Sequence, residues 1–416
     1  MVKKYSFYAG AAKGDITPAE ELFPIPFIGP IAIDRVCDRI YVRALMMDDG
    51  SSRILFMTLD VCILPHYKEM EKLISEETGI PQDHIFMAAT HTHEVPITGA
   101  GDYLEGVTEE PKRRKWYEAL LKTVLDTAKE AERNLRPARI GYGTGKSYVN
   151  ANRDALPREK GGKSEIGINF ERPSDKTLAL VRIEDLDGKT IALIINYAVH
   201  AVVLNGCIVE GGIGLSGDLP GRTSALLEEK IDGAVVLWTS GAAGDQNPRI
   251  MGQYGIEIRD GNPYLKNLEE KGYMILDFLT AEHVEDILEV NDRIVCEEEE
   301  AEIYSAERTA VCPGRKAEKD PVSYTLRLLT VGEIAFEGIS AEVVTSVGKA
   351  VREDSPYRKT ILVSHACGYC GYVPDDWEYE HDAFEAEGTP VKQGYAQPAF
   401  IRGFRELFKE RMGRRK

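Results

Sequence analysis

The chain has 416 residues, 43% of them hydrophobic, and a formal net charge of −17 at pH 7. This length and apolar content are enough for a large hydrophobic core, in one large domain or in two. The acidity argues against nucleic acid as a partner and against tight docking on anionic membranes, because both are bound through basic patches. No apolar segment approaches the ~18 residues of a membrane span, and we expect neither a secretory signal nor a membrane contact.

Apolar runs that indicate buried strands alternate with amphipathic helical patterns along the chain. The expected helices cover residues 67–77, 116–128, 223–231, 343–351 and 400–412, and the expected strands residues 85–87, 190–199, 234–238, 334–336 and 361–363. Asp218 is the expected N-cap of the third helix, with Pro220 in its first turn. No Gly/Ser-rich or Pro-rich linker divides the sequence, so we expect a single α/β domain over residues 1–416.

The most informative motif is Ala88-Ala89-Thr90-His91-Thr92-His93, directly after the first of these strands. Chemistry in layered α/β proteins collects where loops leave the ends of strands. Clustered histidines mark metal binding or acid/base catalysis. Because the chain has only eight histidines, this pair at a strand end favours a functional site over a chance surface loop.

The other expected strands also lead into residues with ligand or acid/base chemistry. The four runs are followed, in chain order, by His200, by the segment 239–248, by Glu337 and Glu342, and by His365 and Tyr372. Each signal alone is weak, but their recurrence indicates that one edge of a sheet system carries one site.

Zinc hydrolases surround the metal with about three protein ligands and leave one position open for water. His91 and His200 are the best imidazole candidates, and Glu342 is a carboxylate that would complete the set. On an extended backbone His93 would point away from the face that carries His91. This predicts a division of roles, with His91 on the metal and His93 as a proton carrier or oxyanion donor.

The seven cysteines are odd in number and widely scattered, which favours reduced thiols and a cytoplasmic location. Cys367 and Cys370 form a C-x-x-C pair, but a redox pair normally opens a helix, and here Gly371-Tyr372-Val373-Pro374 follows. No second pair is present to complete a structural zinc site. We therefore interpret them as incidental loop cysteines.

Taken together, these motifs resemble the neutral (non-lysosomal) ceramidase family, with Ala89-Thr90-His91-Thr92-His93 as the most specific match. The resemblance runs in the same order through most of the chain, over Gly10–Pro18, Leu59-Asp60, Ala89–His93, Asn152-Arg153, Asp175–Arg182, Asn196–His200, Ser216–Asp218, Ala243–Pro248 and Gly371–Val373. It implies a mixed α/β catalytic domain in which packed central β-sheets are flanked by α-helices.

The resemblance also implies roles for individual residues. One zinc ion per chain, or another divalent metal, would be bound by His91, His200, Glu342 and Tyr372. His93 would be a catalytic histidine outside the ligand set, with Asp245 as a second catalytic candidate. Arg153 and Asn247 would lie on the substrate side of the pocket.

Four departures from the family pattern shape the functional prediction. Asn247 stands where the family has its active-site serine, and Glu94-Val95-Pro96-Ile97 replaces a Gly-rich segment. We also expect no C-terminal immunoglobulin-like domain and no secretory signal. Asn247 cannot be a nucleophile, although its amide can donate a hydrogen bond to an oxyanion. The prediction is therefore a zinc-dependent hydrolase that uses metal-activated water on an amide of a small polar molecule, and not on ceramide.

Two alternatives stay open at the level of sequence. The same metal scaffold could serve a lyase, an isomerase or a glycoside-cleaving enzyme, in which the metal polarises a carbonyl or hydroxyl. A catalytically silent binding protein could also keep the metal for stability. The expected partner in every case is a small molecule, and the chain is a possible homo-oligomer.

Overall fold

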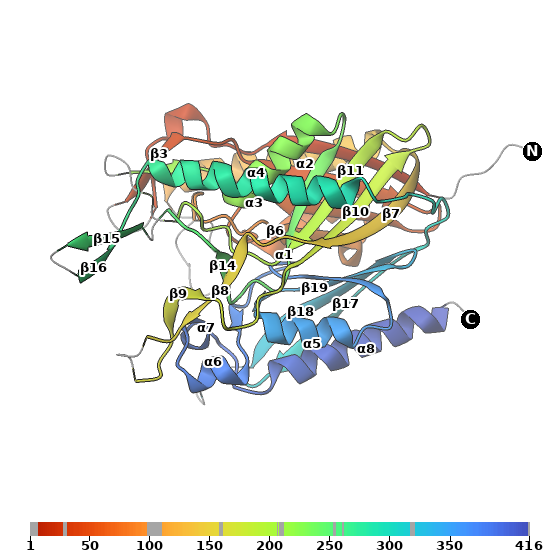
Figure 1. Cartoon of the computed structure of the whole chain (residues 1–416). Coiled ribbons are helices and arrows are strands. Elements are labelled where there is room, and N and C mark those ends of the chain that lie inside the picture. Colours follow the sequence, from red (N-terminus) through yellow and green to blue (C-terminus); the bar gives the residue numbers. More distant parts are fainter. Residues whose placement is uncertain are drawn as a thin grey trace, which may run out of the picture.

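The chain forms four layers in the computed structural model, with helices on the outside and two β-sheets face to face between them (Figure 1). The residues that the structure describes are 7–27, 31–97, 110–157, 161–205, 207, 212–252, 255–259, 262–316 and 321–414. Among the helices in these ranges, none has the length and apolar character to cross a membrane.

The larger sheet has eight strands in the order β13-β11-β10-β7-β1-β4-β5-β6. In chain order these strands are β1 (Tyr8–Asp15), β4 (Tyr41–Asp48), β5 (Arg53–Leu59), β6 (Ile85–Ala89), β7 (Arg136–Lys146), β10 (Thr177–Asp185), β11 (Thr190–Tyr197) and β13 (Val235–Ser240). The pairing is antiparallel in the middle, while the two outermost pairs, β11–β13 and β5–β6, are parallel. Parallel pairing at both edges sends the ends of β6, β11 and β13 toward the loops that carry the histidines.

The smaller sheet has the order β17-β18-β19-β21 and packs against the inner face of the larger one. Its strands are β17 (Ile303–Cys312), β18 (Val322–Val331), β19 (Ile334–Ile339) and β21 (Lys359–Val363). Three phenylalanines join the sheets: Phe56 and Phe86 stack with ring centroids 4.8 Å apart, and Phe336 of the smaller sheet lies 5.4 Å from Phe56. A Cβ on Gly338 would come within 2.8 Å of the Phe86 ring, so the close approach of the sheets requires glycine there.

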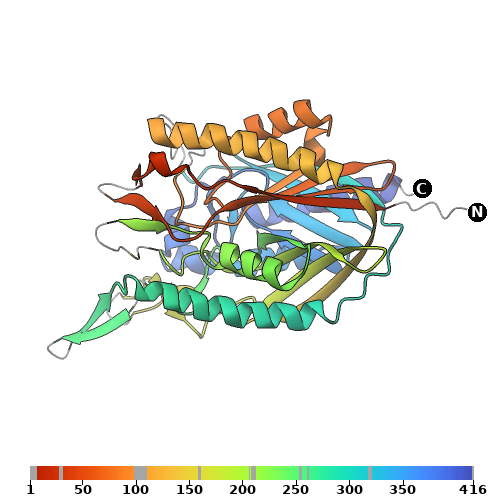
Figure 2. The same cartoon turned by 90° about the horizontal axis from the view of Figure 1, so that it is seen from above.

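Helices cover both outer faces. On the larger sheet lie α2 (Pro111–Arg133), α3 (Asp218–Lys230) and α4 (Lys271–Asn291), with α3 between the other two (Figure 2), and α1 (Tyr67–Thr78) packs against α2. The smaller sheet is covered by α5 (Thr345–Glu353) and α8 (Ala396–Arg414).

Short elements gather at the end of the sandwich opposite the two chain termini (Figure 1). They are the sheet β14-β8-β9, with β14 (Gln246–Pro248), β8 (Asn150–Ala155) and β9 (Glu165–Asn169), the pair β20 (Glu342–Val343) and β22 (Tyr372–Val373), and the helices α6 (Asp376–Glu380) and α7 (Phe384–Glu387). Two further small sheets are β12-β3-β2, with β2 (Ile25–Pro26), β3 (Ala32–Val36) and β12 (Ile213–Leu215), and β15 (Gly255–Arg259) with β16 (Asn262–Lys266).

The five expected strands and five expected helices are all present within a few residues of their predicted bounds. The prediction for Asp218 is wrong. It is the first residue of α3, with Gly217 as the N-cap. Its carboxylate accepts hydrogen bonds from the backbone N–H groups of Val203 (3.1 Å) and Leu204 (2.8 Å). Asp218 therefore fixes the segment that follows His200 to the start of α3.

Hydrogen bonds between the two sheets hold their strand ends together. The backbone N–H of Ala89 donates to the carbonyl of His365 (3.1 Å), and that of Ser364 donates to the carbonyl of Ser240 (2.9 Å). The side-chain amide of Asn196 donates to the carbonyl of Leu362 (3.0 Å). The ends of β6, β11 and β13 in one sheet are thus tied to the end of β21 in the other. This arrangement confirms that the predicted strand ends meet at one edge.

Glu337 on β19 is the outlier of this core, because its side chain is fully buried and neither carboxylate oxygen has a hydrogen-bond partner. Burial, with a smaller contribution from Asp354, raises the pKa of this carboxyl well above its ordinary value of 4.5. The folded protein therefore keeps the proton over a pH range in which the unfolded chain has released it. Stability is lost as the pH rises from about 4.5 toward the folded pKa.

Replacing Glu337 with methionine should raise the free energy of unfolding by about 1–3 kcal/mol at about pH 8, because a buried group without a partner is removed at similar volume. The gain should shrink toward about pH 4, below the ordinary value of 4.5, where the unfolded chain also holds most of its proton. Urea unfolding at the two pH values measures it, with the exposed Glu353→Gln as control. Equal gains at both pH values would contradict a buried, protonated Glu337.

Candidate metal centre

His91 is held at the end of β6 by the segment that follows β5. Its backbone N–H donates to the carbonyl of Val61 (3.0 Å), and its ring Nδ1 donates to the carbonyl of Cys62 (2.7 Å). A carbonyl can only accept, so Nδ1 carries the proton and Nε2 presents its lone pair. This backbone bond from the second ring nitrogen is the usual way in which a metal-binding histidine is oriented.

His200 follows β11 and is oriented in the same way. Its backbone N–H donates to the carbonyl of Gln246 (2.9 Å), and its ring Nδ1 donates to the carbonyl of Ala243 (2.7 Å). Nε2 again faces the interior of the site. The segment 243–246, predicted from sequence as part of the site, therefore acts through its backbone on the orientation of His200.

Glu342 lies between the two imidazoles. Its Oε2 is 3.4 Å from His91 Nε2 and 3.1 Å from His200 Nε2, and its Oε1 accepts a hydrogen bond from the Tyr369 hydroxyl (2.6 Å). The hydroxyl of Tyr372 is 3.4 Å from His200 Nε2. The structure thus brings together all four residues predicted as metal ligands, and each is at most 8% exposed.

The electrostatics of this cluster require a positive charge. Burial alone would raise the pKa of Glu342, but the positive charge of a protonated His91 holds it well below its ordinary value. Burial alone would lower the pKa of His91, but Glu342 and Cys62 raise it to about 10. Burial and the neighbouring Arg153 lower the pKa of His200 to about 3. A carboxylate beside two imidazoles therefore needs one cation, which is either a proton on His91 or a metal ion.

The donor set fits zinc. Two imidazole nitrogens, a carboxylate oxygen and a phenol oxygen are ligand types that zinc accepts. The separations of 3.1 and 3.4 Å between Glu342 Oε2 and the two Nε2 atoms are close to the ~3.3 Å between donors that each lie ~2.0 Å from a tetrahedral ion. With both Nδ1 atoms bonded to carbonyls, the two Nε2 lone pairs face the site, where that of His200 also accepts a hydrogen bond from Arg153 Nη1 (3.3 Å).

The expectation that His93 and His91 point to opposite faces is wrong. His91 has φ +65°, a left-handed conformation, so the backbone turns there instead of staying extended. The two rings lie edge to face with centroids 4.7 Å apart, and their Nε2 atoms are 3.3 Å apart. This distance suits either a second role beside the centre or a further ligand, so the proton-carrier role of His93 stays a prediction.

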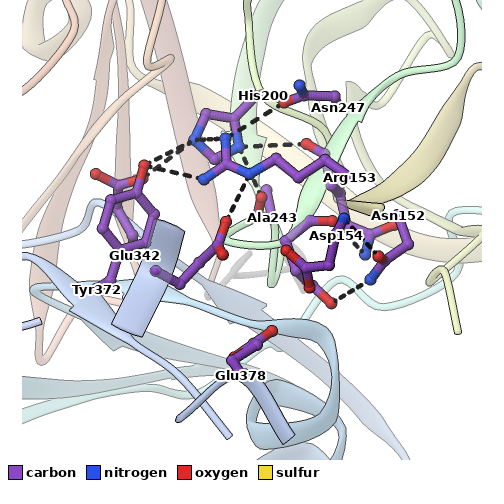
Figure 3. A network of polar contacts seen from close by, with 12 residues as sticks. Asn152, Arg153, Asp154, His200, Ala243, Asn247, Glu342, Tyr372 and Glu378 are labelled. Atoms are coloured by element: carbon purple, nitrogen blue, oxygen red, sulfur yellow. Dashed lines mark hydrogen bonds and ion pairs between the residues drawn. The ribbon is translucent and has the colours of Figure 1, made fainter. Parts of the chain in front are cut away.

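Arg153 on β8 connects the cluster with a second group of side chains. Its Nε donates to Glu385 (2.6 Å), its Nη2 donates to the Tyr372 hydroxyl (3.2 Å), and its Nη1 donates to Asn247 Oδ1 (3.3 Å). Figure 3 shows the guanidinium between His200 and Tyr372, with Nη1 3.3 Å from His200 Nε2. Both residues predicted on the substrate side therefore lie beside the candidate metal centre.

Asp245 is placed differently from the other candidates. Its Oδ1 accepts from the backbone N–H and the hydroxyl of Thr345, both at 2.8 Å, and its Oδ2 accepts from the Asn152 amide (2.9 Å). Its carbonyl accepts from the backbone N–H of Arg153 (2.9 Å). The carboxylate thus bonds to α5 and β8, and the catalytic role of Asp245 stays a prediction.

Three residues at the site were not predicted from the sequence. His365 stacks on His91 with ring centroids 3.8 Å apart, is buried, and has no hydrogen-bond partner on either nitrogen. Tyr369 orients Glu342, and Cys62 places its sulfur 3.9 Å from His91 Nδ1. Only His365 could have been found from the sequence, because it follows the predicted strand over residues 361–363.

Five side chains at the site form two other groups that could bind a metal ion. One ligand atom each from His91, Glu342 and His365 lie within 4.8 Å of one another, and the same holds for Cys62, His91 and His93. Cys367 and Cys370, by contrast, are free thiols that belong to neither group.

The fold and this cluster define an α/β sandwich with a candidate metal centre at the meeting ends of its sheets. The family described as neutral/alkaline non-lysosomal ceramidase, N-terminal, matches residues 7–263. The chain therefore belongs to the neutral/alkaline ceramidase family, as its motifs predicted.

Sequence relatives match part of this chain. Neutral ceramidase B of Dictyostelium discoideum is 24% identical over 275 residues, which are 62% of this chain and 37% of that protein. The neutral ceramidase of Pseudomonas aeruginosa is 23% identical over 203 residues, which are 46% of this chain and 30% of that protein. The chain thus matches well under half the length of either relative.

Solved structures match nearly the whole chain. The crystal structure of the Pseudomonas aeruginosa neutral ceramidase superposes with a TM-score of 0.76 at 16% identity and covers 96% of this chain and 73% of that one. A structure described as a ceramidase complexed with C2 gives a TM-score of 0.73 at 15% identity, with 98% and 76% covered. These matches confirm the predicted mixed α/β fold of packed sheets and flanking helices.

The purified protein should contain about one divalent metal ion per chain, because two imidazole nitrogens lie within 3.4 Å of one Glu342 oxygen, with the Tyr372 hydroxyl 3.4 Å from one of them. The double variant His91→Ala/His200→Ala should lose it, since both nitrogen ligands are removed. Elemental analysis measures the content, and His84→Ala/His381→Ala is a control that removes two half-buried histidines elsewhere. Wild-type protein without metal, or a double variant with unchanged metal, would contradict the assignment.

Proposed function

We propose that this chain is a metal-dependent hydrolase, with zinc as its metal, that cleaves an amide (C–N) bond of a small polar molecule and not of ceramide. The observation that carries the proposal is the convergence of His91 Nε2 and His200 Nε2 on one oxygen of Glu342, with the Tyr372 hydroxyl beside them. Membership of the neutral/alkaline ceramidase family supports hydrolysis as the reaction class.

A zinc ion held by these residues would supply two things, a lowered pKa for a water molecule and polarisation of the substrate carbonyl. The protein's own contribution begins with orientation. The Nδ1 bonds of both histidines to backbone carbonyls, and the Tyr369 bond to Glu342, fix the donors before any substrate arrives. Fixed donors lower the reorganisation that would otherwise accompany the reaction.

Arg153 is the residue best placed to act on the substrate. Its two terminal nitrogens reach Tyr372 and Asn247 at the edge of the cluster, while Glu385 holds its Nε from behind. A guanidinium fixed in this way donates hydrogen bonds to an oxygen that gains negative charge. The Asn247 amide lies next to it and gives a second polar contact where the family pattern has serine.

His93 is the proton carrier in this proposal. It is half-buried, whereas His91 and His200 are buried, so it stands on the more accessible side of the cluster. Its position beside His91 allows it to take a proton during bond cleavage and to return it to the leaving amine.

A polar substrate is proposed because the groups around Arg153 are polar or charged. On the side of the candidate metal centre, its guanidinium contacts the Asn247 side chain and the Tyr372 hydroxyl. Relatives are named neutral ceramidases, but they share only 23–24% identity with this chain in the two comparisons given above. The replacement of serine by Asn247 separates this site from the family pattern at a residue that contacts Arg153.

Long-chain ceramide in detergent should be a poor substrate, with turnover at least ~10³-fold below an ordinary enzyme rate of ~10 s⁻¹. In a panel of N-acyl amino acids and N-acyl amino sugars, at least one should release its amine in a metal-dependent way. Fluorescent detection of the released amine measures the turnover of ceramide and of each compound in the panel. Ceramide turnover at the ordinary rate would refute the proposed substrate class, and no hydrolysis of any amide by metal-loaded protein would refute the reaction.

Replacement of His93 with alanine should lower turnover of the best substrate by ~10²–10⁴-fold, the usual contribution of general acid/base catalysis. Metal content should stay at the wild-type level if His93 carries protons. His84→Ala, at the opposite end of β6, is the matched control and should change neither quantity. Loss of metal in His93→Ala would instead show that His93 is a ligand.

A further inference from the structure

A second polar centre lies behind Arg153, on the side away from the candidate metal centre. It consists of four carboxylates: Asp154 on β8, Asp245 before β14, Glu378 on α6 and Glu385 on α7. Figure 3 shows Asp154 and Glu378 below the Arg153 side chain. We refer to these four residues as the carboxylate cluster.

The cluster is compact and closed to solvent. One carboxylate oxygen each of Asp154, Asp245 and Glu378 lie within 4.8 Å of one another. Asp154 and Asp245 are 2% exposed, and Glu378 and Glu385 are 0% exposed. Ionised carboxylates this close together repel one another unless a cation or a proton lies between them.

The nearby cations do not balance this charge. Arg153 donates to Glu385, and the Arg172 guanidinium lies 3.6 Å from both Asp154 Oδ2 and Glu378 Oε1, beyond hydrogen-bonding distance. Four carboxylates against two guanidinium groups leave two negative charges. A buried negative charge without compensation costs several kcal/mol, so the cluster must take up either protons or a further cation.

Three carboxylate oxygens of the cluster have no hydrogen-bond partner. They are Asp154 Oδ2, Glu378 Oε1 and Glu385 Oε2, each on a side chain that is at most 2% exposed. Buried carboxylate oxygens are almost always hydrogen-bonded. Asp154 Oδ2 and Glu378 Oε1 have only the long ion pair with Arg172, and Glu385 Oε2 has no hydrogen bond, so these three oxygens point to a ligand. The electrostatics agree: burial and neighbouring carboxylates raise the pKa of Asp154 to about 8 and that of Glu378 to about 11.

We propose that the carboxylate cluster binds a hard divalent cation, Ca²⁺ or Mg²⁺, in a site separate from the candidate metal centre. All its donors are carboxylate oxygens, the ligands that these two ions prefer and that zinc shares with nitrogen and sulfur. One such ion supplies the two missing positive charges and uses the orphaned oxygens. Its role is positional, because Glu385 belongs to the cluster and also holds Arg153 Nε.

The test uses full-length protein stripped with chelator and reloaded with one equivalent of zinc. After dialysis at ~1 mM Ca²⁺ or Mg²⁺, a concentration that even weak protein sites bind, elemental analysis should find about one such ion per chain. The His91→Ala/His200→Ala variant should take up the same amount, because it lacks only the zinc ligands. Saturation should raise the Tm by about 5 °C.

The matched variant Asp154→Asn/Glu378→Gln keeps shape while removing two charges, and it should bind at most ~0.2 ions per chain with no Tm response. The control Glu380→Gln/Glu387→Gln, which neutralises exposed residues of the same two helices, should behave as wild type. Should the double variant fail to fold, Asp154→Asn alone gives the same comparison. No Ca²⁺ or Mg²⁺ uptake by wild type, or equal uptake by the Asp154 variants, would overturn the proposal, whatever the zinc content.

Discussion

The Glu342 carboxylate, buried between two imidazole nitrogens, is the constraint on which the site depends. An ion of this kind inside a protein costs several kcal/mol unless a partner compensates it. The two Nε2 atoms face Glu342 with their lone pairs because both Nδ1 atoms are bonded to carbonyls. Lone pairs facing a carboxylate repel it, so the arrangement needs a positive charge at their meeting point, which is either a proton on His91 or a metal ion. The proposed zinc ion is that charge.

The scaffold makes this meeting possible by tying two sheets together at one end. His91 and His200 leave the larger sheet, whereas Glu342 and Tyr372 belong to β20 and β22 beside the smaller one. Bonds such as those from Ala89 to His365 and from Ser364 to Ser240 cross between the sheets directly behind the donors. Donor side chains from segments up to about three hundred residues apart in the sequence are thereby held close enough to bind one metal ion.

Much of this architecture could be predicted from the sequence, because apolar runs and helical periodicity report directly on burial. The strands before His91 and His200 were identified in this way, and the four candidate ligands followed from family motifs. Tertiary details were not accessible. The turn at His91 depends on a left-handed backbone, which non-glycine residues seldom adopt. It brings His93 beside His91 and overturns the prediction based on an extended strand.

Tyr369 and Glu385 were missed by the sequence analysis for one reason, since each acts through a partner that is distant in the chain. Tyr369 is defined by its bond to Glu342, and Glu385 by its bond to Arg153, 232 residues away. Arg153 in turn joins the candidate metal centre to the carboxylate cluster. No local sequence pattern predicts that Arg153 bonds to both Glu385 and Tyr372, although these bonds connect the two sites.

Anomalous diffraction from crystals of metal-replete protein, recorded on either side of the zinc absorption edge, tests the central claim most directly. The account predicts one zinc peak at coordination distance, ~2.0–2.3 Å, from His91 Nε2, His200 Nε2 and the Glu342 carboxylate, with the Tyr372 hydroxyl as the fourth protein ligand. A zinc peak elsewhere in the molecule, or a fully loaded crystal with no peak between these residues, would contradict it.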